Sequence, residues 1–165
     1  MQKPFNFEAQ KTLDILSAGA FLTTRSEGRL NTMTISWGAI GIMWGKPVFA
    51  AMVRASRFTH GLIEAAGEFT VSLPSQDMQK ALGLCGSASG RDIDKFEAAK
   101  LKPAPSAKIK TPRIDCKGTH YECITLVKAD MTPQNAADEV KKTWYQDNDY
   151  HTFYFGEIVN TEIVD

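Results

Sequence analysis

Two arginines and two hydroxyl side chains lie close together in the segment 54–59, which contains Arg54, Ser56, Arg57 and Thr59. This segment lies where a predicted strand ends and a predicted helix begins, with Ser56 as the expected N-cap. A helix N-terminus presents free N–H groups and the positive end of a dipole, and arginine is a forked, permanently charged donor that fits phosphate oxygens. The segment therefore indicates a phosphate-binding site. The alternative is an ordinary serine N-cap beside two solvated arginines.

A run of small residues follows at 85–91, with the sequence Cys-Gly-Ser-Ala-Ser-Gly-Arg. Small side chains allow a backbone to approach a ligand closely, and Gly90 can adopt a positive φ angle. The run lacks the Gly-Lys-Ser/Thr ending of a Walker loop and the spacing of a dinucleotide fingerprint. It is either a ligand-binding loop or a helix C-cap followed by a flexible turn, and the run alone favours the second interpretation.

Cys116, His120 and Cys123 have a spacing that suggests a zinc site. A zinc ion usually requires four ligands, or three ligands and a water. On a strand, Cys116 and His120 would share a face whereas Cys123 would point to the other. We therefore expect no metal and interpret these cysteines as buried strand residues.

Side-chain nucleophiles and bases have little support in this sequence. No Gly-x-Ser-x-Gly elbow occurs, and the histidines, His60, His120 and His151, lie in unlike settings that are typical of structural or surface roles. Trp37 and Trp44 flank a glycine-rich stretch, where aromatic rings can either wall a flat ligand or simply fill a core. Together with the strand hydroxyls, the phosphate segment and the Gly/Ser run, they indicate a phosphorylated planar cofactor rather than a catalytic side chain.

Strands must position these residues, because strand patterns dominate the chain and the helices between them show no βαβ rhythm. One long strand is predicted at 31–43, in which Met33, Ile35 and Trp37 face one side and Thr32, Thr34 and Ser36 face the other. The other predicted strands are 20–26, 48–53, 68–73, 120–129 and 153–164, and the predicted helices are 6–18, 57–66, 75–84, 93–100 and 132–145. The pattern predicts an α+β domain or a β-barrel decorated with helices.

The length and composition of the chain indicate how many domains it forms and which partners it lacks. The chain has 165 residues, with 19 Lys+Arg balancing 19 Asp+Glu, so we expect one domain, 1–165, and no nucleic-acid partner. The three cysteines are too few for a disulfide framework, which favours reduced thiols in a cytoplasmic protein. Residues 1–5 start no apolar signal segment and no stretch is apolar enough to span a bilayer, so we expect no membrane partner.

Several motifs, in order along residues 7–160, resemble those of the flavin reductase-like family, the FMN-binding split barrels that include flavoredoxin. The strand Asn31-Thr32-Met33-Thr34-Ile35-Ser36-Trp37-Gly38 resembles the second-strand signature of that family, and Arg54-x-Ser56-Arg57-x-Thr59 resembles its phosphate segment. The remaining similar blocks are 67–74, the Gly90-Arg91-Asp92-Ile93-Asp94-Lys95-Phe96 run, Tyr121-Glu122-Cys123 and His151-x4-Gly156-Glu157-Ile158. One departure is an insertion at 131–149, before the last strand.

The resemblance implies a mainly β fold with helices, a split β-barrel, that binds FMN as a homodimer. The flavin ring would lie against the strand Thr32–Trp37, held largely by backbone groups and by Thr34 and Ser36. The cofactor-binding residues expected from this segment are Asn31, Thr32, Met33, Thr34, Ile35, Ser36 and Trp37. The phosphate would contact Arg54, Ser56, Arg57 and Thr59. The residues that would close the site are Cys85, Ser87, Ser89, Gly90, Lys95 and Phe96.

The resemblance also implies an activity, an NAD(P)H-dependent flavin reductase in which hydride passes to flavin N5 without a protein acid or base. NAD(P)H would bind only transiently, because no Rossmann fingerprint is present. One alternative is a flavoredoxin-type electron carrier that exchanges electrons with a redox protein and does not use NAD(P)H directly. The other is a split-barrel binding module without enzymatic activity.

Overall fold

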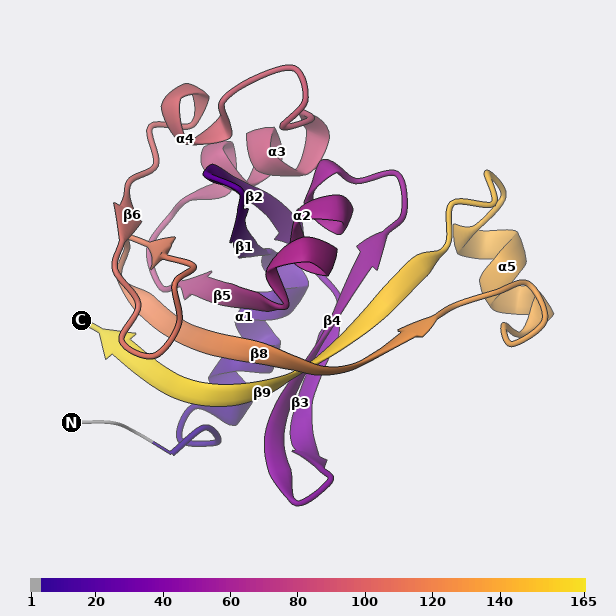
Figure 1. Cartoon of the computed structure of the whole chain (residues 1–165), viewed down its shortest axis with the longest axis horizontal. Helices are drawn as coiled ribbons and strands as arrows, with labels where there is room; N and C mark the ends of the chain where they lie inside the picture. Colours follow the sequence, from indigo (N-terminus) through magenta and orange to yellow (C-terminus); the bar gives the residue numbers. More distant parts are fainter. Residues whose placement is uncertain (1–3) are drawn as a thin grey trace.

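Residues 4–165 are described by a computed structural model, and residues 1–3, the start of the expected domain, lie outside the described residues. Seven strands form one antiparallel sheet in the order β2-β1-β5-β8-β9-β4-β3 (Figure 1). Their bounds are β1 Ala20–Ser26, β2 Arg29–Ile35, β3 Gly38–Met43, β4 Lys46–Arg54, β5 Glu68–Pro74, β8 Gly118–Asp130 and β9 His151–Val164. A small second sheet pairs β6 (Pro103–Ala104) with β7 (Arg113–Ile114).

The sheet curls into a barrel that stays open along one seam. Within residues 4–165, the two edge strands β2 and β3 do not pair with each other, although only Ser36 and Trp37 separate them in the sequence. The chain therefore crosses from one edge of the sheet to the other at these two residues. The mainly β fold with helices that the sequence predicted is confirmed.

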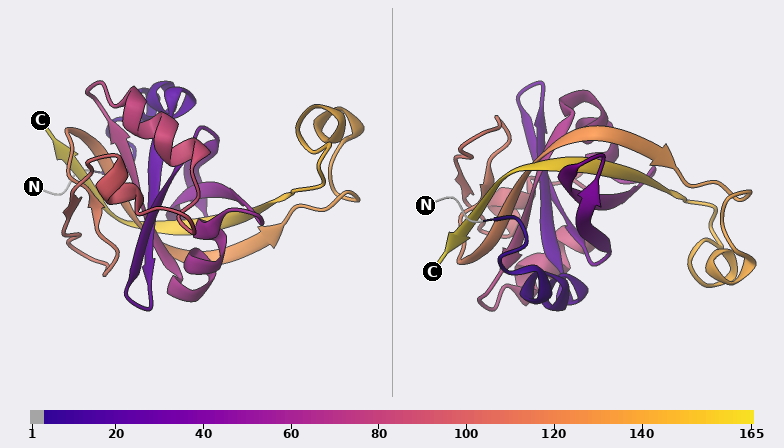
Figure 2. Two further views of the ribbon diagram at one scale, coloured as in Figure 1. Left: turned by 90° about the horizontal axis from the view of Figure 1, so that it is seen from above. Right: turned by 90° about the horizontal axis from the view of Figure 1, so that it is seen from below.

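Five helices complete the fold: α1 Ala9–Ala18, α2 Phe58–Ala66, α3 Gln79–Ser87, α4 Lys95–Ala98 and α5 Asp138–Trp144. α2 packs against β1 and α3 against β2, so both lie beside the β2 edge of the seam. By contrast, α5 is carried away from the barrel on the extended ends of β8 and β9 (Figures 1 and 2). None of the helices formed by residues 4–165 has the length and apolar character needed to cross a bilayer.

Two apolar clusters hold the barrel together. The larger one fills the inside of the sheet and includes Leu22, Phe49, Phe69 and Tyr121, all fully buried. The smaller one lies under α3 and is built by Phe21, Leu82, Cys85, Leu101, Ile114 and Cys116. Because α3 is anchored by this second cluster, it forms a fixed support for the neighbouring β2 edge.

Two of the predicted elements at the seam are wrong in informative ways. The segment 31–43 is not one strand but two, because β2 pairs with β1 whereas β3 pairs with β4 at the opposite edge of the sheet. The Gly/Ser run at 85–91 begins as helix, since α3 continues to Ser87. α3 also starts later than expected, after Ser75 has extended the β5 region by donating its N–H to the Lys117 carbonyl.

Three predicted helix starts are also displaced. Arg57, not Ser56, is the N-cap of α2, and α1 starts at Ala9 because a turn at Pro4 precedes it. α5 starts at Asp138 rather than near Thr132. Residues before it are held in a turn by Asn135, whose side chain accepts from the Thr132 N–H and donates to the Asp130 carbonyl.

Candidate functional site

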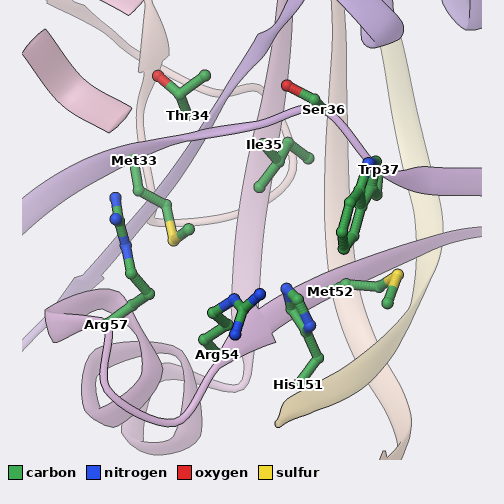
Figure 3. Close-up of a pocket in the computed structure, with 9 residues that line it drawn as sticks. All are labelled: Met33, Thr34, Ile35, Ser36, Trp37, Met52, Arg54, Arg57 and His151. Atoms are coloured by element: carbon green, nitrogen blue, oxygen red, sulfur yellow. The ribbon is translucent and has the colours of Figure 1, made fainter. Parts of the chain in front are cut away.

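A pocket of about 210 Å³ lies at the seam of the barrel, and we call it the seam pocket (Figure 3). The β2 edge and the crossover form one side, and the ends of β4 and β9 form the other. Its lining residues are Met33, Thr34, Ile35, Ser36, Trp37, Met52, Arg54, Arg57 and His151. The structure therefore brings five consecutive predicted cofactor residues, 33–37, to one hollow.

The β2 wall of the seam pocket is rigid and has free backbone groups. Met33 and Ile35 are buried, and the Thr34 hydroxyl donates to the Leu82 carbonyl oxygen at 2.6 Å, which ties β2 to α3. As an edge strand, β2 pairs only with β1 among the described strands, so alternate N–H and C=O groups face the seam. Such groups suit a flat ligand with polar edges.

His151 lines the opposite wall as a neutral ring. Its Nδ1 lies 2.7 Å from the Tyr145 hydroxyl, and its ring centroid lies 5.6 Å from that of Trp37. Burial, reinforced by the charge of Arg54, lowers the pKa of His151 to about 4. The imidazole is therefore uncharged at neutral pH and acts as an aromatic surface.

A second hollow of about 190 Å³ lies where α2 begins and α3 ends, and we call it the polar pocket. It is lined by Ser56, Arg57, Phe58, Thr59, Ser87, Ala88, Ser89, Gly90, Arg91 and Lys95. Phe58 and Thr59 belong to the first turn of α2, where N–H groups have no acceptor within the helix. Arg57 lines both pockets and so connects them.

Three cationic side chains converge on the polar pocket. The Arg57 guanidinium donates from Nη1 to the Gly86 carbonyl at 2.7 Å, and Arg91 Nη1 donates to the Ser56 carbonyl at 2.9 Å. Lys95 is only 3% exposed and its Nζ donates to the Cys85 carbonyl at 2.8 Å. Burial and the nearby Arg57 charge lower the pKa of Lys95 to about 8. An anion in this pocket would therefore relieve repulsion among fixed cations.

Ser56 contributes to the polar pocket while paired with an acidic residue. Its hydroxyl donates to Asp149 Oδ2 at 2.5 Å, and its N–H donates to Asp149 Oδ1 at 3.1 Å. Asp149 lies in the inserted hairpin, so the pairing links that hairpin to the start of α2.

Thr59 and Gly90, which line the polar pocket, pack closely against Asn31 on β2. The Asn31 amide donates to the Thr59 hydroxyl at 2.8 Å. A Cβ on Gly90 would lie 2.3 Å from Asn31 Oδ1 and 2.6 Å from Phe58 Cδ1. Only glycine therefore lets the 89–91 loop pack against β2 and complete the pocket.

Arg54 belongs to the seam pocket and not to the polar pocket. Its Nη1 donates to the Asp149 carbonyl at 2.6 Å, and its Nη2 donates to the Trp144 carbonyl at 2.9 Å. Its Cζ also lies 5.0 Å from the centroid of the Tyr145 ring. The structure thus separates Arg54 from Ser56 and Thr59, with which the sequence grouped it.

Comparison with known proteins agrees with this geometry. The sequence profile of the family described as "Flavin reductase like domain" matches residues 15–165. The chain belongs to the flavin reductase-like family. The family resemblance that the motifs predicted is therefore confirmed.

Individual known proteins are similar to the chain to different degrees. An uncharacterised protein of Archaeoglobus fulgidus is 31% identical over 93 residues, which cover 56% of this chain and 52% of that protein. Flavoredoxin of Desulfovibrio vulgaris has a similar fold, with a TM-score of 0.71, 22% identity, and coverage of 89% of this chain and 69% of flavoredoxin. An FMN-binding protein from Thermus thermophilus with bound 1-cyclohex-2-enone has a TM-score of 0.69, 23% identity, and coverage of 88% and 69%.

The chain spans only 52% and 61% of the lengths of two curated relatives that it matches. The solved structures are less than 25% identical to it, and their similarity concerns the split-barrel fold.

Four of the predicted cofactor residues of this flavin reductase-like chain line neither pocket. Asn31 lies behind the polar pocket, where its amide donates to the Thr59 hydroxyl. Thr32 is fully buried, with its hydroxyl donating to the Leu22 carbonyl, and Phe96 packs against the cluster under α3. Cys85 is also fully buried, burial raises the pKa of its thiol, and only its carbonyl reaches Arg57 and Lys95.

Five lining residues were outside the predicted cofactor-binding set: Met52, Phe58, Ala88, Arg91 and His151. Ala88 belongs to the Gly/Ser run at 85–91. Arg91 and His151 stand inside motifs that resemble the family, which was the available signal. Met52 and Phe58 carried no signal of their own, since both are ordinary apolar residues until the fold brings them to the seam.

The Cys116, His120 and Cys123 spacing does not produce a shared site. His120 Nδ1 lies 2.9 Å from Ser72 Oγ and its Nε2 lies 3.0 Å from the Cys116 carbonyl, so both ring nitrogens have protein partners. Cys116 and Cys123 belong to the two different apolar clusters. Within residues 4–165, no group of three or more His, Cys, Asp or Glu residues is arranged to hold a metal ion.

Proposed function

We propose that this chain binds FMN and acts as an NAD(P)H-dependent flavin reductase. The observation that carries the proposal is that Arg57 lines both a ring-sized seam pocket and a cationic polar pocket. FMN has the same two parts, a flat ring and a phosphate, joined by a short ribityl chain. The family match and the FMN named in the Thermus thermophilus structure support this choice of ligand.

In this proposal the seam pocket holds the flavin ring. Met33, Ile35 and the Trp37 ring provide apolar surface, and the edge of β2 provides backbone hydrogen bonds for the ring's polar edge. The neutral His151 ring adds an uncharged wall. Burial of a tricyclic ring against such surfaces supplies most of the ring affinity.

The polar pocket holds the phosphate in the same proposal. Arg57, Arg91 and Lys95 supply charge, the start of α2 supplies N–H groups, and Ser87 and Ser89 supply hydroxyls. These residues fit a dianionic phosphate. Without it, Arg57 and Lys95 donate their hydrogen bonds to backbone carbonyls, which carry no net charge to balance the two cations.

FMN, when bound, supplies the redox chemistry by accepting hydride from a nicotinamide. The chain's own side chains would orient the ring, exclude water from one face and hold the phosphate. None of the groups lining the seam pocket has the protonation behaviour of a general acid or base near neutral pH, since His151 stays neutral. This arrangement fits a transfer that needs no proton relay from the protein.

We further propose that the protein is a homodimer, with a second copy covering the outer face of β4, β8 and β9. The paired residues Val127, Phe155 and Ala50 lie side by side there, next to Ala129, Phe153 and Met52. Phe153 and Phe155 are stacked and only half-buried. Met52 also lines the seam pocket, so the apolar face continues into the site and favours a copy of this chain as the cover.

A second candidate function is flavoredoxin-type electron transfer, which the fold similarity to flavoredoxin favours. The open seam would then serve a redox protein rather than NAD(P)H. Reduced cytoplasmic surroundings suit either function, and the three cysteines are free.

Absorbance spectroscopy of the purified protein, titrated with FMN, tests the proposal. We expect a protein-bound flavin spectrum, followed by rapid anaerobic bleaching on mixing with NADH or NADPH. Bound FMN that neither nucleotide bleaches, but that a chemical reductant does, would select the electron carrier. A protein that takes up no FMN would instead be a binding module, and light scattering on the same sample tests the dimer.

A further inference from the structure

Arg54 helps to fasten the inserted hairpin between β8 and β9 to the barrel, together with Ser56, which hydrogen-bonds to the Asp149 carboxylate. α5 has no buried residue, so burial of its own side chains does not fix its position. Arg54 reaches from the end of β4 to two carbonyls of the hairpin, those of Trp144 and Asp149, at 2.9 and 2.6 Å. Its guanidinium also lies over the Tyr145 ring.

The fastened part of the hairpin contacts a wall of the seam pocket. The Trp144 ring meets the Trp37 ring edge-on, with centroids 4.8 Å apart and an interplanar angle of 82°. Figure 3 shows Trp37 pointing into the pocket beside Met52 and His151. Trp37 is 37% exposed, and its ring centroid also lies 5.6 Å from that of His151.

We infer that Arg54 and Trp144 are positioning residues for the ring wall of the seam pocket, which rests on the proposed function of that pocket. Arg54 holds segment 144–149, and Trp144 then holds the Trp37 ring in the orientation that borders the pocket. The insertion thereby determines which flat ring fits, although Trp144 itself does not line the pocket.

This role differs from phosphate binding for a physical reason. The carboxylates of Asp147 and Asp149 lie 3.5 and 4.0 Å from Arg54 Nη1, whereas the terminal nitrogens of Arg57 donate to the carbonyls of Gly86 and Cys85. A phosphate brought to Arg54 would meet two negative charges as well as one positive charge. Arg54 therefore acts through the hairpin rather than on the anion.

Binding of FMN and of riboflavin separates the two roles, because riboflavin has the ring without the phosphate. We expect Arg54→Ala and Trp144→Ala to raise the Kd of both ligands by the same factor, about two- to tenfold, as loss of an edge-on aromatic contact would. Trp144→Phe should restore most of the affinity, since it keeps an aromatic edge. Trp44→Phe is the matched control, because Trp44 is also exposed but packs on Phe155 at the β3–β4 turn.

A measurement without ligand tests whether Arg54 and Trp144 hold the Trp37 ring in place, an arrangement that we call the clamp, even if no flavin binds. Two indole rings 4.8 Å apart should produce an exciton couplet in the far-ultraviolet circular dichroism spectrum. We expect the couplet in the wild type and in Trp44→Phe, and its loss in Trp144→Phe and Arg54→Ala. Thermal melts identify any variant that has not folded, and Arg54→Lys then serves as the milder substitution.

The outcomes are distinct. A couplet that survives in a folded Arg54→Ala protein overturns the clamp. A larger loss of FMN than of riboflavin affinity in Arg54→Ala would make Arg54 a phosphate ligand and also overturn the inference. Failure of the wild type to bind either flavin would overturn the proposed function, while the couplet would still decide whether Arg54 positions the Trp37–Trp144 pair.

Discussion

Lys95 donates a hydrogen bond from Nζ to the carbonyl oxygen of Cys85 at 2.8 Å, and this ammonium group is almost fully buried. Burial and the neighbouring Arg57 charge lower its pKa from 10.5 to about 8. In the ligand-free protein the unfolded chain therefore binds more protons than the folded chain between these two values. The contribution of Lys95 to the free energy of unfolding should therefore rise with pH across this window and should be unfavourable below pH 8.

The first prediction uses Lys95→Met, which removes the buried charge. Below pH 8, the variant should be more stable than the wild type by up to about 3 kcal/mol, because it buries no charge. Loss of the hydrogen bond to the Cys85 carbonyl reduces this gain. Urea unfolding at pH 7, 9 and 10 measures this, with the wild type as reference. A difference in stability between the variant and the wild type that does not shrink between pH 8 and 10 would show that the pKa of Lys95 is not lowered in the folded protein.

The second prediction concerns Arg91, which lines the polar pocket but was absent from the residues first expected to bind the cofactor. Arg91→Ala should weaken FMN by about 1.5–3 kcal/mol, the worth of one charge-assisted contact, and leave riboflavin unchanged. Fluorescence titration with both ligands measures the difference. Equal weakening of the two would place Arg91 on the ring or ribityl chain instead.

The third prediction concerns acid stability. His120 and His151 both have a pKa lowered from 6.5 to about 4, chiefly by burial. Between these values the unfolded chain binds more protons, so stability should fall as pH drops through this range. At pH 5 the loss should be about 2 kcal/mol for each histidine.

His120→Gln tests the contribution of His120 to this pH dependence, because a glutamine amide does not titrate and can still reach Ser72 and the Cys116 carbonyl. The variant should show a shallower decline of unfolding free energy between pH 6.5 and 5. An unchanged slope would mean that His120 titrates normally in the folded protein.

The fourth prediction compares Gly90, in the loop that follows α3, with Gly83 inside α3. Gly90→Ala should destabilise the protein by about 1–3 kcal/mol, because the new Cβ would overlap Asn31 and Phe58. It should also weaken FMN, since the 89–91 loop must move. Gly83→Ala is the control: nothing lies within 4 Å of its Cβ position, so this substitution inside α3 should be neutral or stabilising. Thermal melts of both variants measure this, and equal melting temperatures would contradict the packing argument.

Local sequence patterns predicted the strands β1 and β5 and the family well, because alternation and turn residues act over short distances. Ala20–Ser26 has its predicted bounds, and the Gly67 αL cap ends α2 where expected. The motifs also predicted that residues 33–37 and Arg57 bind the cofactor, and these residues line the seam pocket.

The remaining errors come from contacts distant in sequence. Nothing within 31–43 reveals that Ser36 and Trp37 must cross between opposite sheet edges, since that depends on the pairing of β1 and β4. Likewise, Arg54 has a phosphate-like sequence context, but its partners Trp144 and Asp149 lie about ninety residues away, in the inserted hairpin. Side-chain partners of this kind cannot be read from spacing along the chain.

The β8–β9 ladder ends at the pair Asp130 and Thr152, where the Thr152 hydroxyl donates to the Asp130 carboxylate at 2.7 Å. Residues 131–150 pair with no strand of the sheet, so their length and sequence can change without shifting any strand. The 131–150 segment, which lies beside the seam pocket, can thus be replaced as a unit. Transplanting the corresponding hairpin of a relative offers a way to alter ring selectivity while the barrel and the polar pocket stay constant.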